Sequence, residues 1–265
     1  MQPLAEAPVD WGRGLRGVFC DIDDTLTWEG RLVPEAFQAL AKLQAAGLRV
    51  VPITGRPGGW VDHIARMWPV DGVVGENGGL WFFHRDGKLH RRFLQPADER
   101  AANRARLTAL GERILAAVPG SALASDQPYR ELDLAIDFCE DVPHLGDAGI
   151  DAIVAGFHDA GATCKVSSIH VNGWYGSFDK LEGCRRIVAE LWGEDLDEVR
   201  NDYAFFGDSA NDEPMFGYFP CSIGVANVAD FLERMDAHPT WITAEPGGHG
   251  FASAIERLLE LEHRG

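Results

Sequence analysis

Short apolar runs alternate along this chain with stretches in which apolar residues recur at helical spacing. Apolar runs at residues 15–22, 48–54 and 72–75 predict buried strands. Residues 34–46 predict a helix, because a proline stands near the start of the segment and Gly47 directly follows its end. Buried strands that alternate with amphipathic helices are typical of a parallel sheet covered by helices on both faces.

The same alternation returns in the last third of the chain. Helical spacing predicts further helices, and short apolar runs predict further strands. The predicted strands are residues 203–206, 221–225 and 241–243, and the predicted helices are residues 60–68, 181–192, 211–218 and 251–261.

The middle of the chain has a different pattern. A hairpin with Gly87 in its turn is followed by a long helix and by a strand whose apolar and polar residues alternate, as expected for one buried face. The predicted elements are a hairpin at 82–94, helices at 97–118 and 145–160, and strands at 131–138 and 163–171. We therefore expect an α/β fold, with a Rossmann-like parallel sheet core (residues 1–81 and 173–265) and an inserted α+β cap domain (residues 82–172).

Composition narrows the possible partners. The 265 residues are 46% hydrophobic, which is enough for a sizeable core, and the net charge of −17 argues against nucleic acid and anionic membranes as partners. No apolar run is long enough to span a bilayer, and the first residues do not have the pattern of a signal peptide. The five scattered cysteines contain no Cys-x-x-Cys pair, so we expect reduced thiols and a cytoplasmic location. The oligomeric state does not follow from the sequence.

The segment Asp21-Ile22-Asp23-Asp24-Thr25 directly follows the first apolar run. The C-terminal end of a strand is where open α/β sheets bind ligands. Repulsion between clustered carboxylates must be offset there by a cation, a proton or a hydrogen-bond network. The segment therefore suggests Asp21 as a nucleophile, Asp23 as an acid and base, and Mg²⁺ as the neutralising charge.

Further polar clusters accompany the aspartates. The hydroxyl and main-chain N–H groups of Thr54-Gly55-Arg56 can bind phosphate oxygens. Glu76-Asn77-Gly78-Gly79 ends the third strand, and Lys180 opens a helix, where its ammonium can neutralise a phosphoryl group and the nucleophile together. Asp208 and Asp212 follow a later strand and can complete a hard-cation site.

The order of these motifs, DxDDT, TGR, ENGG, the lysine of Phe178-Asp179-Lys180 and GDSxND, resembles the haloacid dehalogenase superfamily of phosphatases. The place of the insert resembles a type-II cap of subfamily B, whose members include sucrose, trehalose and mannosyl-phosphoglycerate phosphatases and the phosphomannomutases. The resemblance covers nearly the whole chain. It implies a Mg²⁺-dependent phosphatase that hydrolyses a small phosphorylated metabolite, a sugar phosphate or a related monoester, through an aspartyl-phosphate.

Chemistry and resemblance together assign the catalytic roles. Asp21 would attack phosphorus. Asp23 would protonate the leaving alkoxide and later deprotonate the attacking water. Thr54 and Lys180 would bind the transferring oxygens. Thr25 would fix the loop that aims Asp23.

The resemblance also implies the metal and substrate contacts. Mg²⁺ would be held by Asp21, the main-chain carbonyl of Asp23 and Asp208, with Asp212 as a further ligand or as a residue that orients the ligands. The candidate substrate-binding residues are Gly55, Arg56, Asn77, Lys180, Asn211 and His170.

Several of these residues have a purely structural alternative. Asp208 could cap the next helix, and Lys180 could be a surface lysine. Arg56 could form a structural ion pair instead of a substrate contact. His170 and Trp174 lie where the insert returns to the core, and could touch the leaving group or pack as a hinge. The adjacent arginines Arg91 and Arg92 could hold a second anionic group, or could simply face solvent.

Two other functions also fit the motifs. A phosphomutase on the same fold would need a second phosphate site in the cap, where the sequence has only scattered basic residues. A non-catalytic binding protein could keep the fold, although every expected catalytic position is occupied.

Overall fold

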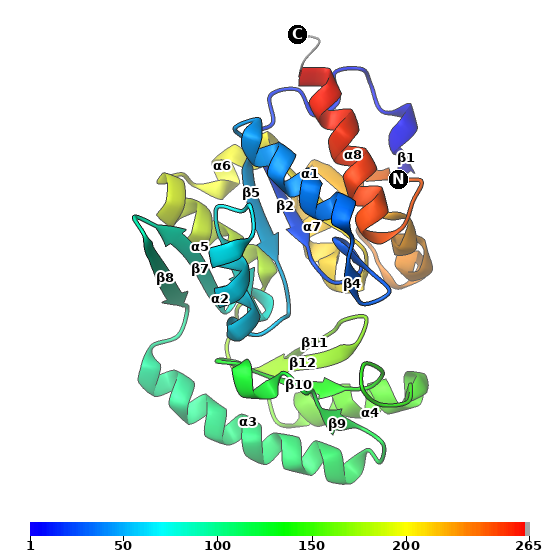
Figure 1. Cartoon of the computed structure of the whole chain (residues 1–265). Helices are drawn as coiled ribbons and strands as arrows, with labels where there is room; N and C mark the ends of the chain where they lie inside the picture. Colours follow the sequence, from blue (N-terminus) through cyan, green and yellow to red (C-terminus); the bar gives the residue numbers. More distant parts are fainter. Residues whose placement is uncertain (263–265) are drawn as a thin grey trace.

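The computed structural model describes residues 1–262, and its largest element is a nine-stranded sheet (Figure 1). Seven of its strands run parallel to their neighbours, and the last two form an antiparallel hairpin at one edge of the sheet. In sheet order the strands are β1 (Gln2–Pro3), β15 (Trp241–Ile242), β14 (Cys221–Gly224), β13 (Tyr203–Gly207), β2 (Gly17–Asp21), β5 (Arg49–Ile53), β6 (Val73–Gly75), β7 (Leu80–Arg85) and β8 (Lys88–Phe93).

Helices cover both faces of this sheet, as predicted. On the central strand β2, Val18 and Cys20 join one apolar cluster and Phe19 joins the other, so the strand is buried on both sides. Burial on both sides explains why the strands read as continuous apolar runs. One face packs on α1 (Pro34–Ala45), α2 (Gly58–Met67) and α8 (Gly247–Glu262), and the other on α5 (Lys180–Trp192), α6 (Leu196–Val199) and α7 (Glu213–Tyr218).

A second, smaller sheet forms the body of the cap. Its antiparallel strands are ordered β11-β12-β10-β9, and α3 and α4 pack on the side that faces away from the large sheet (Figure 1). Leu110, Ile136 and Phe157 belong to its own apolar cluster, so the cap has a separate core. The bounds are α3 (Ala97–Ala117), β9 (Ala122–Leu123), β10 (Asp133–Asp137), α4 (Gly146–Asp159), β11 (Thr163–Val166) and β12 (His170–Trp174).

The predicted α/β core with an inserted α+β cap is confirmed, but three details differ. The hairpin at 82–94, predicted as part of the insert, pairs through β7 with β6 and so extends the large sheet. Its apolar pattern could not reveal which sheet it would join. The single strand predicted at 163–171 is a hairpin of β11 and β12, turned at residues 167–169. Strand β10, predicted to have one buried face, is buried on both, because its polar face lies against the core.

Glu76 fastens the cap to the core through main-chain atoms. Its buried carboxylate accepts a hydrogen bond from the N–H of Gly58, the first residue of α2, at 2.8 Å. The same carboxylate accepts from three consecutive cap N–H groups, those of Glu131 (2.8 Å), Leu132 (2.6 Å) and Asp133 (3.3 Å). Four N–H donors meet one carboxyl group, so the cap segment and the helix start are held by the same side chain.

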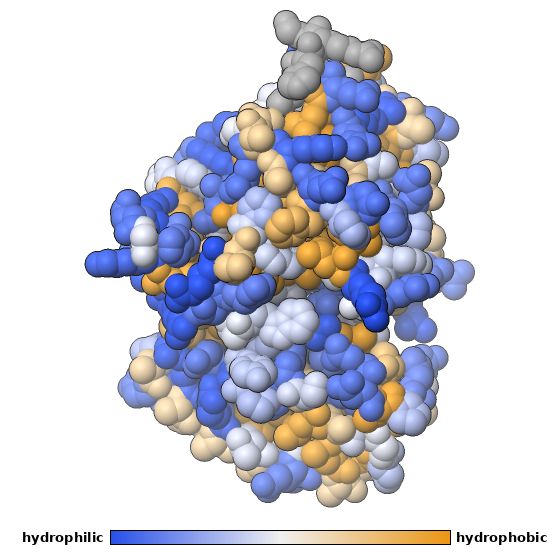
Figure 2. Space-filling view, in the orientation of Figure 1, coloured by the Kyte–Doolittle hydropathy of each residue, from blue (hydrophilic) through white to orange (hydrophobic). Residues whose placement is uncertain are grey.

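Glycines allow the two lobes to approach closely at this point. A Cβ on Gly59 would lie 2.8 Å from the Cβ of Tyr129 in the cap, and a Cβ on Gly58 would lie 3.4 Å from the Cγ of Glu131. Any larger side chain at Gly59 would push the cap segment away from α2. The space-filling view shows the two lobes in contact along the visible face (Figure 2). Over residues 1–262, the structure has no helix with the length and apolarity that a bilayer crossing requires.

Candidate active site

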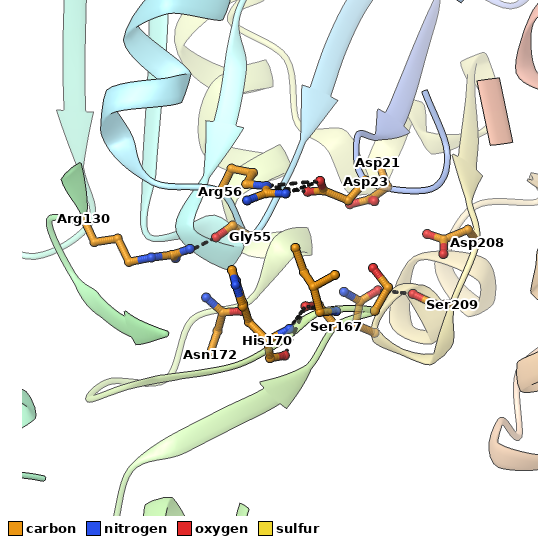
Figure 3. Close-up of a pocket in the computed structure, with 13 residues that line it drawn as sticks. Asp21, Asp23, Gly55, Arg56, Arg130, Ser167, His170, Asn172, Asp208 and Ser209 are labelled. Carbon is orange, nitrogen blue, oxygen red and sulfur yellow. Dashed lines mark hydrogen bonds and ion pairs between the residues drawn. The ribbon is translucent and has the colours of Figure 1, made fainter. Parts of the chain in front are cut away.

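Three strand ends converge at the C-terminal edge of the large sheet. Asp21 ends β2, Thr54 follows the last residue of the neighbouring strand β5, and Asp208 follows the last residue of β13. Asp21, Asp23, Gly55 and Asp208 line one pocket, which the cap covers from the opposite side (Figure 3). The cavity measures about 20 Å³, so the closed lobes leave room for little more than a water molecule.

Lys180 links two carboxylates of this site. It is the first residue of α5, and Asp179 caps that helix by accepting a hydrogen bond from the N–H of Glu182 at 2.9 Å. The buried Lys180 Nζ lies 2.6 Å from Asp21 Oδ1 and 2.7 Å from Asp212 Oδ1. Burial alone would lower the pKa of Lys180, but the two carboxylates raise it above its ordinary value. The ammonium group therefore stays charged beside Asp21.

The acidic cluster has the composition of a hard-cation site. Asp21, Asp208 and Asp212 each offer a carboxylate oxygen, and these oxygens lie within 4.8 Å of one another. All three residues are buried, and burial, followed by the charges of Asp212 and Asp21, holds the pKa of Asp208 well above its usual range. One ammonium group cannot balance three carboxylates. The oxygen ligands and the excess negative charge fit a divalent cation such as Mg²⁺.

Asp23 and Arg56 form a bidentate ion pair. The Nε of Arg56 lies 3.1 Å from both carboxylate oxygens of Asp23, and its Nη2 lies 2.9 Å from Oδ1 (Figure 3). The guanidinium also stacks on the ring of Trp60, 4.5 Å from the ring centroid. The structure thus places Arg56 in an ion pair at the pocket wall, where it orients Asp23 and remains within reach of a ligand.

Hydroxyl groups hold the loops around the site. The Thr54 hydroxyl accepts a hydrogen bond from the N–H of Arg56 at 2.9 Å, which folds the loop after β5. The Thr25 hydroxyl donates to Asp208 Oδ1 at 3.2 Å, and this contact joins the loop after β2 to the loop after β13. The expectation that Thr25 fixes the loop around Asp23 fits this contact.

The two candidate asparagines lie on the side of Lys180. Asn77 is buried with a left-handed backbone (φ 54°), and its side-chain amide lies 3.3 Å from where a Cβ on Gly55 would be. Glycine at position 55 therefore makes room for the asparagine. Asn211 lines the main pocket and also a second small pocket beside Asn77 and Lys180.

The cap contributes a wall that sequence reasoning found only in part. His170, Ser167 and Asn172, on and beside β12, line the pocket opposite Asp23 (Figure 3). His170 Nε2 lies 2.8 Å from Glu140 Oε2, a residue that the sequence did not single out. The sequence feature that pointed to this wall was the polar face of the strand at residues 131–138, because an inserted sheet must turn that face towards the core.

Glu140 completes an ion network across the lobes. Its Oε1 lies 2.9 Å from Arg56 Nη2. The close approach of His170, together with the charge of Arg56, lowers the pKa of Glu140 from 4.5 to about 2. Arg130, also missed, donates to the main-chain carbonyl of Gly55 at 2.9 Å (Figure 3). Both contacts join a cap side chain to the loop after β5.

Comparison with known proteins supports the same fold. Residues 18–102 match the family model described as haloacid dehalogenase-like hydrolase. A solved structure from Thermoplasma acidophilum has a TM-score of 0.71 at 17% identity, covering 93% of this chain and 99% of that chain. The sucrose-phosphatase from Synechocystis, solved with sucrose and phosphate, has a TM-score of 0.65 at 17% identity, covering 92% and 98%. A subclass IIB sugar phosphatase has a TM-score of 0.60 at 15% identity, covering 93% and 99%.

This chain has the haloacid dehalogenase fold. The resemblance to haloacid dehalogenase-like proteins predicted from the motifs is confirmed over residues 18–102, and the solved structures that share the fold include one named as a subclass IIB sugar phosphatase. A comparison with curated sequences gives no match. At these identities, likeness to the solved structures establishes the fold and leaves activity to be argued from the site.

Two arginines do not join this haloacid dehalogenase-like site. Arg91 pairs with Asp62 on α2, and Arg92 Nε lies 2.7 Å from Glu190 Oε1 on α5. Their strand β8 extends the large sheet, so the suggestion that they hold a second anionic group of the substrate is wrong. Trp174 is almost fully buried and stacks on Phe178 with 5.3 Å between ring centroids, which fits the packed-hinge alternative.

Proposed function

We propose that this protein is a Mg²⁺-dependent phosphatase that hydrolyses a small phosphorylated metabolite, a sugar phosphate or a related monoester, in the cytoplasm. The observation that carries the proposal is the buried arrangement of Asp21 beside Lys180, with Asp23 two residues on and Asp208 and Asp212 nearby. A nucleophile, a charge-neutralising ammonium group and a hard-cation site together are the parts that phosphoryl transfer needs.

The residues divide the reaction into two steps. In the first, Asp21 attacks phosphorus, the bond to the leaving oxygen breaks, and Asp23 gives that oxygen a proton. In the second, Asp23 takes a proton from water, which attacks the aspartyl-phosphate and releases inorganic phosphate. Lys180 stays charged throughout and stabilises the negative charge on the transferring oxygens.

The metal and the remaining contacts complete this picture. Mg²⁺, when bound by Asp21, Asp208 and Asp212, would supply positive charge to the phosphoryl oxygens and to the crowded carboxylates. The N–H groups that follow Thr54, together with Asn211, would orient the phosphoryl group. Arg56 must release Asp23 in part, because the bidentate ion pair engages both carboxylate oxygens, one of which must reach the leaving oxygen.

A panel of phosphate esters, assayed with and without Mg²⁺, tests the proposal. We expect hydrolysis of sugar phosphates and of p-nitrophenyl phosphate in Mg²⁺, loss of both with excess chelator, and recovery when Mg²⁺ is added back. Asp21→Asn keeps the side-chain shape but removes the attacking charge, so turnover should fall by about 10⁴-fold or more. Substantial activity of this variant, or full activity in chelator, would overturn the proposal.

A phosphomutase remains the main alternative, and the same assay distinguishes it. A mutase keeps the phosphoryl group and must bind the intermediate in a second orientation, so it would convert a sugar 1-phosphate to a 6-phosphate faster than it releases phosphate. Asp126 and Asp133 bind the buried cap arginine Arg130, which leaves it unsuited to a second phosphate site.

A further inference from the structure

A row of charged contacts crosses the pocket on the side of the leaving group. The row runs from Asp23 through the Arg56 guanidinium to Glu140, with both carboxylates 2.9 Å from Nη2, and then to His170 at 2.8 Å. As the proposed acid, Asp23 faces the oxygen of the bond that breaks. Glu140 and His170 lie beyond it, where the rest of the leaving group must extend.

Two arginines line this side of the pocket, and both are already paired with carboxylates. Arg56, already bound to Asp23 and Glu140, also places Nη1 3.5 Å from Asp126. Arg130 has a fully buried side chain, and its Nη1 lies 3.0 Å from both carboxylate oxygens of Asp133. Its Nε lies 3.0 Å from Asp126. Each guanidinium is therefore shared by at least two carboxylates.

The balance of charge on this side is negative. Two guanidinium groups face four carboxylates, and a net negative charge remains even when His170 is protonated. A second anionic group on the leaving group would meet like charge in a partly desolvated site, which is costly. Lys165, an exposed cap lysine, lines instead the separate small pocket beside Asn211 and Lys180, on the phosphoryl side. The four carboxylates are those of Asp23, Asp126, Asp133 and Glu140.

Hydroxyl groups suit this site, since a hydroxyl can accept from a guanidinium and donate to a carboxylate at once. We propose that Glu140 and His170 form the specificity-determining subsite, which takes a neutral polyhydroxylated leaving group and rejects one that carries a carboxylate or a second phosphate. This inference rests on the proposed phosphatase function. Because the closed cavity is only about 20 Å³, the cap must open and admit hydroxyls between Arg56 and Glu140.

A matched pair of substrates tests the inference on the wild-type protein. Sorbitol 6-phosphate and 6-phosphogluconate share an open-chain skeleton and differ at C1, where one has a hydroxymethyl group and the other a carboxylate. We expect kcat/KM to favour sorbitol 6-phosphate by about tenfold or more. The ratio should narrow as ionic strength rises, since salt screens the repulsion.

The Glu140→Gln variant tests whether Glu140 causes this preference for the neutral substrate. The substitution removes one negative charge but keeps a carbonyl oxygen. The ratio of kcat/KM for sorbitol 6-phosphate to kcat/KM for 6-phosphogluconate should therefore fall by about threefold or more, because kcat/KM for 6-phosphogluconate rises. Glu99→Gln makes the same change on the exposed start of α3 and should leave the ratio unchanged. His170→Asn should lower kcat/KM for sorbitol 6-phosphate more than for p-nitrophenyl phosphate, which has no hydroxyls to bind.

The possible results distinguish failure of this inference from failure of the proposed function. If 6-phosphogluconate is the equal or better wild-type substrate, the inference is wrong and the proposed phosphatase stands. If Glu140→Gln leaves the ratio unchanged while the wild type discriminates, Glu140 is not the specificity residue. If no phosphate ester is hydrolysed, even p-nitrophenyl phosphate with Mg²⁺, the proposed function itself fails.

Discussion

Single side chains at the mouth of the pocket serve both lobes at once. Arg56 belongs to the core, yet it is bound by Asp23 from the core and by Glu140 from the cap. Such a shared guanidinium makes the closed arrangement sensitive to the charge of each partner. The carboxylate that is most strongly affected is Glu140, because His170 and Arg56 both stabilise its ionised form.

Acid should therefore weaken the contribution of Glu140 to stability. Its pKa is lowered on folding from 4.5 to about 2, so its stabilisation is fully present above about pH 5 and is lost as the pH falls towards 2. Urea unfolding of the wild type and of Glu140→Gln should show a free-energy difference that is constant from pH 7 to 5 and shrinks below that. A difference that grows on acidification would contradict this assignment.

Residue chemistry also limits what could be predicted from sequence. Asp21, Asp208 and Lys180 were predictable because carboxylates at strand ends and a lysine at a helix start oppose folding unless they have a function. Glu140 was not, because its importance depends on Arg56, 84 positions away, and on the turn that brings the two together. Arg56 itself stayed ambiguous, since an ion pair and a ligand contact require the same side chain.

At the scale of elements, the cap is docked by the end of one strand and the start of one helix. Glu76 follows β6, and its carboxylate gathers N–H groups from α2 and from the segment that leads into β10. In all four contacts a main-chain N–H group donates a hydrogen bond and the Glu76 carboxyl group accepts it. A side chain that brings its own N–H groups to this position would meet them with repulsion.

Glu76→Gln should therefore loosen the cap. One carboxylate oxygen becomes an amide group that faces backbone donors, and the free energy of unfolding should fall by about 1–3 kcal/mol. Amide hydrogen exchange at residues 131–133 should become faster. As a control, Glu131→Gln changes an exposed side chain whose ion pair to Arg104 spans 3.5 Å, and should have little effect. Unchanged exchange at residues 131–133 would show that Glu76 does not hold the cap.

A glycine packs the same strand end against the segment that carries Lys180, the proposed catalytic lysine. Gly78 has a φ of +101°, and a Cβ there would lie 1.8 Å from the carbonyl oxygen of Asp179, the residue before Lys180. Gly78→Ala should lower both stability and turnover, because the start of α5 must move. Gly47→Ala is the matched control: its φ is +80° with open space around it, so only the backbone cost of about 1 kcal/mol is expected, without loss of turnover. Equal activity of the two variants would contradict this coupling.

Helices and strands were predicted well where the apolar pattern of a segment fitted only one type of secondary structure. Residues 34–46 and 203–206 became α1 and β13 with little change. The hairpin at 82–94 was assigned to the wrong domain, because an apolar strand pattern does not indicate which strand it will pair with. In the structure, β7 pairs with β6 of the large sheet. The requirement for glycine at position 78 could not be predicted, because it comes from a close contact with a distant segment of the chain.

For the molecule as a whole, the acidic cluster joins parts of the chain that are far apart in sequence. Asp21 ends β2 near the start of the chain, whereas Asp208 and Asp212 come from the segment after the cap, and Lys180 bridges Asp21 and Asp212. A cation bound here would tie both halves of the core together. Folding and metal binding should therefore be coupled.

Magnesium should raise the thermal stability of the protein. Only the folded state assembles the three carboxylates, so Mg²⁺ at about 100 times its Kd should stabilise by about 2.7 kcal/mol. Differential scanning calorimetry should show a rise in Tm with Mg²⁺ and none with an equal ionic strength of NaCl. Asp208→Asn should lose most of this rise. A Tm that responds equally to both salts would argue against a specific site.

The Glu76 contacts separate two tasks that the cap must perform. Docking relies on main-chain N–H groups, which every residue except proline carries, whereas the pocket wall relies on the side chains of Glu140 and His170. The side chains of the pocket wall can therefore change while the Glu76 contacts to the cap main chain remain. For protein engineering, the specificity of the cap should be changeable independently of its docking. Libraries at positions 140 and 170 should yield folded variants with docked caps and new substrate preferences, whereas substitutions of Glu76 should yield variants with detached caps.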